Sequence, residues 1–234
     1  MALRTEELAK TIDQTLLEAD AVPGDVETVC RRAGELHLAS VCVLPEHVPL
    51  AAEELRGSDV KVCAVVGFPS GTASAQAKID EAERALADGA GELEFVMNVQ
   101  ALRGGDVRLV RDELVGFVRT MRMKSANGGR GVVVLKAIIG TAHLGDKLKQ
   151  LACKIVEHAE LDFAQTGHGH SASVATIHDV ELLRDCLSER VAVKACGGIG
   201  TLDELHAMVN AGAARIGSSA AFELLEAPPA LARV

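Results

Sequence analysis

One charged side chain lies inside an otherwise apolar stretch near the end of the chain. Residues 191–199 read VAVKACGGI, so Lys194 stands among β-branched and small residues. A run this apolar is typical of a strand covered on both faces, as in a parallel sheet. A buried lysine must be paired with a carboxylate or lose its proton, and a neutral lysine attacks carbonyl carbons. Lys194 is therefore a candidate for Schiff-base chemistry.

Glycines and serines that follow two late strands predict an anion site. Gly197 and Gly198 follow one apolar strand, and Gly217, Ser218 and Ser219 end the next. Glycine lets the backbone come close to a bound group, and the amides at a helix N-terminus hold anions. We expect a helix to begin just after the first glycine pair and another at the two serines. A phosphate group beside a reactive lysine indicates a small phosphorylated carbonyl compound as the substrate.

Other strand ends carry groups that could move protons or contact a substrate. Asp13 and Glu94 are carboxylates, and Lys136 is a second lysine in an apolar run. His168 and His170 follow a later strand, and imidazoles titrate near neutral pH. The candidate set is completed by Gln165, Thr166 and Cys42.

Apolar strand-like runs alternate with helix-like patterns along the whole chain. The strand candidates are 11–15, 39–44, 61–68, 92–99, 131–139, 162–166, 191–196 and 214–217. Apolar residues recur at helical spacing in 73–88, 107–123 and 201–211. Thr201 with Glu204 and Thr176 with Asp179 have the spacing of capping boxes.

Eight such units predict one α/β domain over residues 1–234, a (β/α)8 TIM barrel with a short N-terminal helix. A doubly wound open sheet is the alternative, but it requires a glycine-rich turn after the first strand, and TIDQTLLEAD has none. In a barrel, the carboxyl ends of the strands form the active site, and the last two strands hold phosphate.

The amino-acid composition of the chain restricts the classes of partner that we expect it to bind. The net charge is −9 and aromatic residues make up 2% of the chain, which argues against a nucleic-acid surface or an anionic membrane. Six cysteines without CxxC spacing predict free thiols. No apolar run is long enough to span a bilayer, and MALRTEELAK is not a signal peptide, so we expect a cytoplasmic protein.

The motifs resemble those of the deoxyribose-phosphate aldolase family along nearly the whole chain. The matching segments are IDQTLL (12–17), VCVLP (41–45), VVGFPSG (65–71), the stretch 76–102, LKAIIGT (135–141), LDFAQTGHG (161–169), VKACGGIGT (193–201) and RIGSS (215–219). The resemblance implies a cytosolic barrel that joins acetaldehyde and glyceraldehyde 3-phosphate through a lysine Schiff base, without metal.

The departures from the family pattern lie at positions that carry the family's catalytic chemistry. Gln165 stands where the family has its Schiff-base lysine, and a carboxamide cannot form an iminium. Glu94 replaces an aspartate of the family's proton relay, Gln14 replaces a histidine, and Gly140 replaces a frequent glutamate. The loop after the sixth strand reads GHGHSAS.

Other family positions are retained. Lys194 matches the second family lysine, which lowers the pKa of the nucleophile and relays protons. The remaining matches are Asp13, Cys42, Lys136, Gly197, Gly198, Ser218 and Ser219.

Three interpretations follow. The first is an aldolase-like lyase in which Lys194, or Lys136, forms the iminium, with the other lysine lowering its pKa. The second is a barrel enzyme repurposed for acid–base isomerisation, dehydration or cyclisation, in which Glu94 and His168 move protons and Lys194 stabilises an oxyanion. The third is a non-catalytic protein that binds a phosphorylated ligand.

No cofactor is expected. A zinc variant would use His143, His168 and His170 with Glu94, but ordinary loop histidines explain that pattern as well. By analogy with other barrels, a homodimer is the expected assembly.

Overall fold

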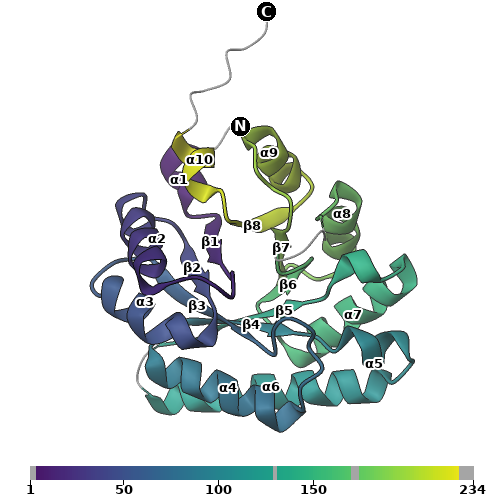
Figure 1. The fold of residues 1–234 in the computed structure, drawn as a ribbon. Helices are drawn as coiled ribbons and strands as arrows, with labels where there is room; N and C mark the ends of the chain where they lie inside the picture. The colour runs from purple at the N-terminus through teal and green to yellow at the C-terminus, as the bar shows by residue number, and fades with distance from the viewer. Residues whose placement is uncertain (1–3, 129–130, 170–173, 227–234) are drawn as a thin grey trace, which may run out of the picture.

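Eight parallel strands close into a barrel in the computed structural model, which describes residues 4–128, 131–169 and 174–226 (Figure 1). Neighbours in the barrel follow chain order, and β8 pairs with β1. The strands are β1 Ile12–Leu16, β2 Ser40–Val43, β3 Lys61–Val66, β4 Glu92–Val96, β5 Val134–Ile138, β6 Phe163–Gln165, β7 Ala192–Cys196 and β8 Ala213–Ser218. The predicted TIM barrel is confirmed, including the weakest strand candidate at 11–15.

Helices surround the barrel (Figure 1). They are α1 Thr5–Ala9, α2 Pro23–Glu35, α3 Val48–Glu54, α4 Ala75–Asp88, α5 Val99–Arg103, α6 Val107–Gly128, α7 Asp146–Ala159, α8 Ile177–Cys186, α9 Leu202–Asn210 and α10 Ala221–Glu226, with short 3-10 turns η1 Pro45–His47 and η2 Thr141–His143. The short N-terminal helix predicted from the sequence is α1. Among the described residues, none of the helices is long and apolar enough to cross a bilayer.

Each strand has an inner and an outer face because successive side chains point in opposite directions. Outward residues such as Val62, Ala64 and Leu93 pack with the helices in the main apolar core. Phe95 of β4 lies against Phe117 of α6, with ring centroids 4.5 Å apart. The inner face of several strands is polar, so the barrel interior, rather than the helix layer, carries the chemistry.

Of the two predicted capping boxes, one forms completely and the other only in part. Thr201 accepts a bond from the Glu204 amide, and the Glu204 carboxylate reaches back, as the capping box predicts. Thr176 likewise caps α8 through the Asp179 amide. The Asp179 carboxylate, however, binds the buried Lys149 ammonium and the Thr141 hydroxyl. The Asp179 carboxylate therefore does not complete the predicted capping box, and it contacts α7 and η2 instead.

A buried ion pair supports the C-terminal end of β4 from outside the barrel. Lys78 of α4 is fully buried, and its Nζ lies 3.1 Å from Glu113 of α6. The same Nζ donates to the Val96 carbonyl at 3.0 Å. This contact ties α4 and α6 to the strand that carries Glu94.

Candidate active site

Six charged side chains fill the interior of the barrel. Three are carboxylates and three are cations, so their formal charges cancel. They are Asp13, Glu92, Glu94, Lys136, Lys194 and Arg215. Burying charge is costly unless each group is paired. The balance of signs and the dense pairing explain how this interior is stable.

Lys194 of β7 is held between two carboxylates. Its Nζ lies 2.7 Å from Asp13 and in direct contact with Glu94, and the side chain is fully buried. Burial alone lowers the pKa of an amine, and Lys136 lowers it further, but Asp13 and Glu94 outweigh both and raise the pKa of Lys194. The prediction that Lys136 leaves Lys194 with a depressed pKa is therefore wrong. Lys194 is an ammonium ion in this arrangement.

Lys136 of β5 is enclosed by three carboxylates. Its Nζ lies 2.7 Å from Asp13, 2.6 Å from Glu92 and 3.2 Å from Glu94. Burial lowers the pKa of this amine, yet the surrounding carboxylates, Asp13 first, raise it well above its ordinary value. Lys136 has one more carboxylate partner than Lys194, so it is the less reactive of the two amines.

The two carboxylates that contact both lysines, Asp13 and Glu94, remain ionised. Burial on its own raises the pKa of Glu94, but the charges of Lys194 and Lys136 lower it to about 2. The pKa of Asp13 is likewise held well below its ordinary value, against burial, by Lys136, Lys194 and Arg215. Arg215 also donates to Asp13 at 2.6 Å. Asp13 is thus a central anion of the barrel and not the cap of a turn.

Gln165 occupies the end of β6, in register with Lys194. Its amide nitrogen donates to Glu94 at 3.1 Å and to the Gly167 carbonyl at 2.6 Å. Its amide oxygen, fully buried, has no hydrogen-bond partner among the residues that the structure describes. A buried acceptor without a donor is costly, and a bound hydroxyl or ammonium would satisfy it. Gln165 therefore positions Glu94 and leaves one acceptor open at the barrel centre.

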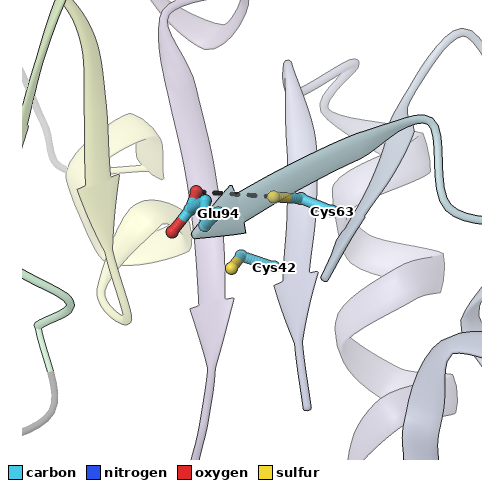
Figure 2. Close-up of side chains that lie close together, drawn as sticks. All are labelled: Cys42, Cys63 and Glu94. Atoms are coloured by element: carbon cyan, nitrogen blue, oxygen red, sulfur yellow. Dashed lines mark hydrogen bonds between the residues drawn. The ribbon is translucent and has the colours of Figure 1, made fainter. Parts of the chain in front are cut away.

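Two thiols lie beside Glu94 (Figure 2). Cys42 of β2 and Cys63 of β3 face each other in register, and Cys63 donates to Glu94 at 3.4 Å. Two sulfurs and a carboxylate oxygen within 4.8 Å of one another are donors that would suit zinc. However, burial raises the pKa of the Cys63 thiol well above its ordinary value, and Glu94 already accepts bonds from Lys194 and Gln165. The group is best described as hydrogen-bonded thiols.

A cavity of about 420 Å³ opens above the cluster, between the ends of β1, β7 and β8. Gly197, Gly198, Gly217, Ser218 and Ser219 all line it, as the sequence predicts for the phosphate side. Gly197 and Gly198 have φ of 114° and 71°, a region that favours glycine. A side chain at Gly217 would meet Cys196 Sγ at 2.5 Å and Lys194 Cε at 3.0 Å. Gly217, which lines the cavity, therefore packs directly against Lys194.

The groups of this cavity that could hold an anion differ from those expected. The helix after Gly198 begins at Leu202, and its Glu204 carboxylate already accepts the amides of Gly200 and Thr201, each at 3.0 Å. Within the part of the chain that the structure describes, no hydrogen bond leaves the backbone amides of Gly198, Ile199 or Ser219. The loop amides, not the helix terminus, are thus available to an anion.

The two serines are also placed differently from the prediction that they begin a helix. Ser218 is the last residue of β8, and α10 begins at Ala221. The Ser218 hydroxyl donates to the Ile199 carbonyl at 2.6 Å and accepts from the Ala220 amide at 3.0 Å. Ser218 therefore joins the two loops that form the cavity, while Ser219 lines it directly.

Filling Gly217 should weaken phosphate binding. We expect Gly217→Ala to lower the affinity for inorganic phosphate by about tenfold or more and stability by about 1–3 kcal/mol, because its methyl group overlaps Cys196 and Lys194. Titration calorimetry and thermal unfolding measure both effects. Gly116→Ala is the matched control, since a methyl group there meets nothing within 4 Å. Unchanged phosphate affinity in Gly217→Ala would contradict the placement of the anion in this cavity.

The remaining predicted site residues lie in two other places. Thr166 is buried, donates to the Cys196 carbonyl at 3.1 Å and accepts from the Cys196 amide at 3.0 Å, so its hydroxyl joins β6 to β7. His168 stacks edge-on against Phe68, with ring centroids 5.1 Å apart, at the mouth of the barrel. His170 lies outside the described residues.

Four members of the cluster were not foreseen from the sequence. They are Ser40, Cys63, Glu92 and Arg215. Glu92 precedes Glu94 by two residues, and Arg215 precedes Gly217 by two, so each shares an inward face with a recognised residue. The alternation of strand side chains was the signal that would have found them.

Comparisons with known proteins agree with this geometry. A family model described as "DeoC/LacD family aldolase" matches residues 8–221. A deoxyribose-phosphate aldolase of Caldanaerobacter subterraneus subsp. tengcongensis is 40% identical over 219 residues, which cover 94% of this chain and 92% of the relative. Deoxyribose-phosphate aldolase 1 of Bacillus licheniformis is 40% identical over 222 residues, 95% of this chain and 96% of that one.

A solved structure is similar over the same length. It is the deoxyribose phosphate aldolase of Aeropyrum pernix, with a TM-score of 0.85, 29% identity, and coverage of 95% of this chain and 91% of that one. The sequence match, the closed barrel and the structural similarity agree. The chain is an aldolase-type enzyme and belongs to the DeoC/LacD aldolase family.

Proposed function

We propose that this enzyme catalyses aldol-type cleavage or formation of a carbon–carbon bond in a small phosphorylated hydroxy-aldehyde, without a covalent bond to residue 165. The observation that carries the proposal is the Lys194 ammonium, held between Asp13 and Glu94 directly below the phosphate cavity. Because the relatives are named deoxyribose-phosphate aldolases, 2-deoxyribose 5-phosphate is the first substrate to test.

In the cleavage direction, a carboxylate takes the proton of the substrate β-hydroxyl. The carbon–carbon bond then breaks, the hydroxyl carbon becomes an aldehyde, and the bonding electrons form an enolate on the other fragment. The Lys194 ammonium stabilises the enolate oxygen, while the Gln165 amide holds Glu94 in place. The proton held by Glu94 is finally delivered to the enolate carbon, so the carboxylate is regenerated and atoms balance.

Access to these groups requires a rearrangement. Lys194 and Glu94 are buried, and Gly169 in the segment after β6 lies close to Cys196 of β7. A side chain at Gly169 would stand 3.1 Å from Cys196 Sγ. A substrate whose phosphate occupies the cavity therefore reaches Lys194 by displacing contacts between this loop and β7.

The pH–rate profile distinguishes the proposal from an iminium at Lys194. Glu94, with its pKa lowered to about 2, stays ionised, and Lys194, with its pKa raised, stays protonated through neutral pH. We expect the rate of 2-deoxyribose 5-phosphate cleavage to vary less than about threefold between pH 6 and 9. Borohydride reduction with substrate present should leave no adduct in an intact-mass spectrum.

An adduct mapped to Lys194 or Lys136, with a rate that rises through neutral pH, would overturn the non-covalent step and support the displaced nucleophile. Gln165→Met, which removes the amide but keeps side-chain length, should lower the rate and leave phosphate binding intact. If neither cleavage nor phosphate binding occurs with folded protein, the proposed function itself is wrong.

Assembly and location extend the same proposal. The structure of the Aeropyrum pernix relative is described as a unique tetramer. We propose that this chain forms a homo-oligomer, with a dimer as the smallest unit, in the cytoplasm. Light scattering coupled to gel filtration measures the oligomeric state, and a monomer at micromolar concentration would contradict it.

A further inference from the structure

A second cavity lies on the opposite side of the barrel mouth from the phosphate cavity. Its volume is about 240 Å³, and segments after β3, β4, β5 and β6 line it. The side chains with donors are Ser70 after β3, Gln100 and Arg103 of α5, His143 in η2, and His168 after β6.

The charge in this second cavity has one sign. Arg103 carries a permanent positive charge, and both imidazoles present N–H donors. None of the described residues that line the cavity is an aspartate or a glutamate, and Gly140 brings no side chain to it. The phosphate cavity, in contrast, includes the carboxylates of Glu18 and Glu204. The second cavity is therefore the more cationic of the two.

The two cavities are separated by a narrow space that shares residues with each of them. A narrow cavity of about 20 Å³ lies between them, over the ends of β5, β6 and β7. It shares Gly140, His143 and His168 with the second cavity and Cys196 with the phosphate cavity. Thr166 and Gly167, the residues that follow Gln165, line the narrow part. A molecule that spans both cavities thus passes above the buried cluster.

We propose that the substrate carries a second anionic group, a phosphate or a carboxylate, that binds Arg103, His143 and His168 in the second cavity. The proposal rests on the proposed function, in which the first phosphate occupies the cavity at Gly197 and Gly217. The substrate is then a small dianionic hydroxy-carbonyl compound, with an anion at each end and the reacting carbons between them. Two anchored ends place those carbons above Lys194.

Binding of unreactive probes tests the proposal. Propyl phosphate carries one anionic group, so its binding to Arg103→Met reports the first site alone, and alkanediol bisphosphates with three to six carbons report both sites in the parent protein. ω-Phosphoalkanoates of the same lengths separate a phosphate from a carboxylate preference at the second end. We expect at least one dianionic probe to bind about tenfold or more tightly than propyl phosphate by titration calorimetry at constant ionic strength.

Two substitutions test where the second anionic group of the probe binds. Arg103→Met should reduce the tightest dianionic probe to the affinity of propyl phosphate, and Gln100→Glu, which keeps the side-chain size, should do the same by charge repulsion. Propyl phosphate should still bind to both variants, at the first site. Arg108→Met on α6 is the control, because Arg108 is exposed and lines neither cavity.

The outcomes separate this inference from the proposed function. If propyl phosphate binds but no dianionic probe binds more tightly, the second anion site is wrong and the first stands. The second site is equally wrong if the gain in affinity persists in Arg103→Met. If propyl phosphate and every dianionic probe fail to bind, the phosphate cavity and the proposed function are overturned.

Discussion

Gln165→Lys should convert the protein into an iminium-forming aldolase. The interior cluster holds three carboxylates and three cations, and a lysine at position 165 adds a fourth cation without a new carboxylate. The buried excess charge is relieved when one amine loses its proton. Lys194 contacts two carboxylates and Lys136 three, whereas residue 165 contacts Glu94 alone. The introduced amine is therefore the one that becomes neutral.

The expected result is a borohydride-reducible adduct at residue 165 with 2-deoxyribose 5-phosphate. Cleavage should exceed that of the unsubstituted protein by about two orders of magnitude, and its rate should rise with pH as the amine loses its proton. Gln165→Met is the matched control, since it has similar length and no amine. A folded Gln165→Lys protein that binds phosphate but forms no adduct would show that the pocket no longer admits the substrate carbonyl.

Lys194→Met should have the largest effect on stability. The substitution leaves the buried Asp13 and Glu94 carboxylates without one of their cations, and such broken pairs cost about 3–5 kcal/mol. For a chain of this size, a loss of that order lowers the melting temperature by about 6–20 °C. Catalysis should be lost as well, because no ammonium remains to stabilise the enolate.

A double substitution separates charge balance from catalysis. Lys194→Met with Glu94→Gln leaves two carboxylates and two cations, so most of the lost stability should return while cleavage stays absent. In the single variant the deficit should shrink as the pH falls from 8 to 5, because the unpaired carboxylates take up protons. Chemical unfolding at several pH values measures the stability that returns in the double variant and the pH dependence of the single variant. Lys194→Met as stable as the parent at pH 7 would mean that Lys194 is neutral when folded.

The strand candidates show how much of the fold can be predicted from the pattern of apolar residues. Short runs of β-branched and small residues, such as 61–68 and 191–196, became β3 and β7 because a strand buried on both faces must be apolar over its whole length. Even the weak candidate at 11–15 became β1, since closure of the barrel needs an eighth strand. Helix ends were less predictable: Ser218 ends β8 instead of starting α10.

Contacts between residues far apart in the chain could not be predicted from the pattern of apolar residues. Asp13 and Lys194 are separated by most of the chain, yet they lie 2.7 Å apart because β8 closes onto β1. Lys78 fits the apolar periodicity of its helix poorly, and only the packing of α4 on α6 buries it against Glu113.

Residue types and local spacing were enough to predict eight strands in a barrel, two lysines in its interior, and an amide at position 165 that cannot form an iminium. The same patterns predict an anion site at the glycines after the last two strands. The protonation states of the interior groups follow from the folded structure. Whether Lys194 is a neutral amine or an ammonium depends on which carboxylates surround it, and barrel closure brought Asp13 and Glu94 to its Nζ. Electrostatic energy depends on distances in space, which local sequence patterns do not contain.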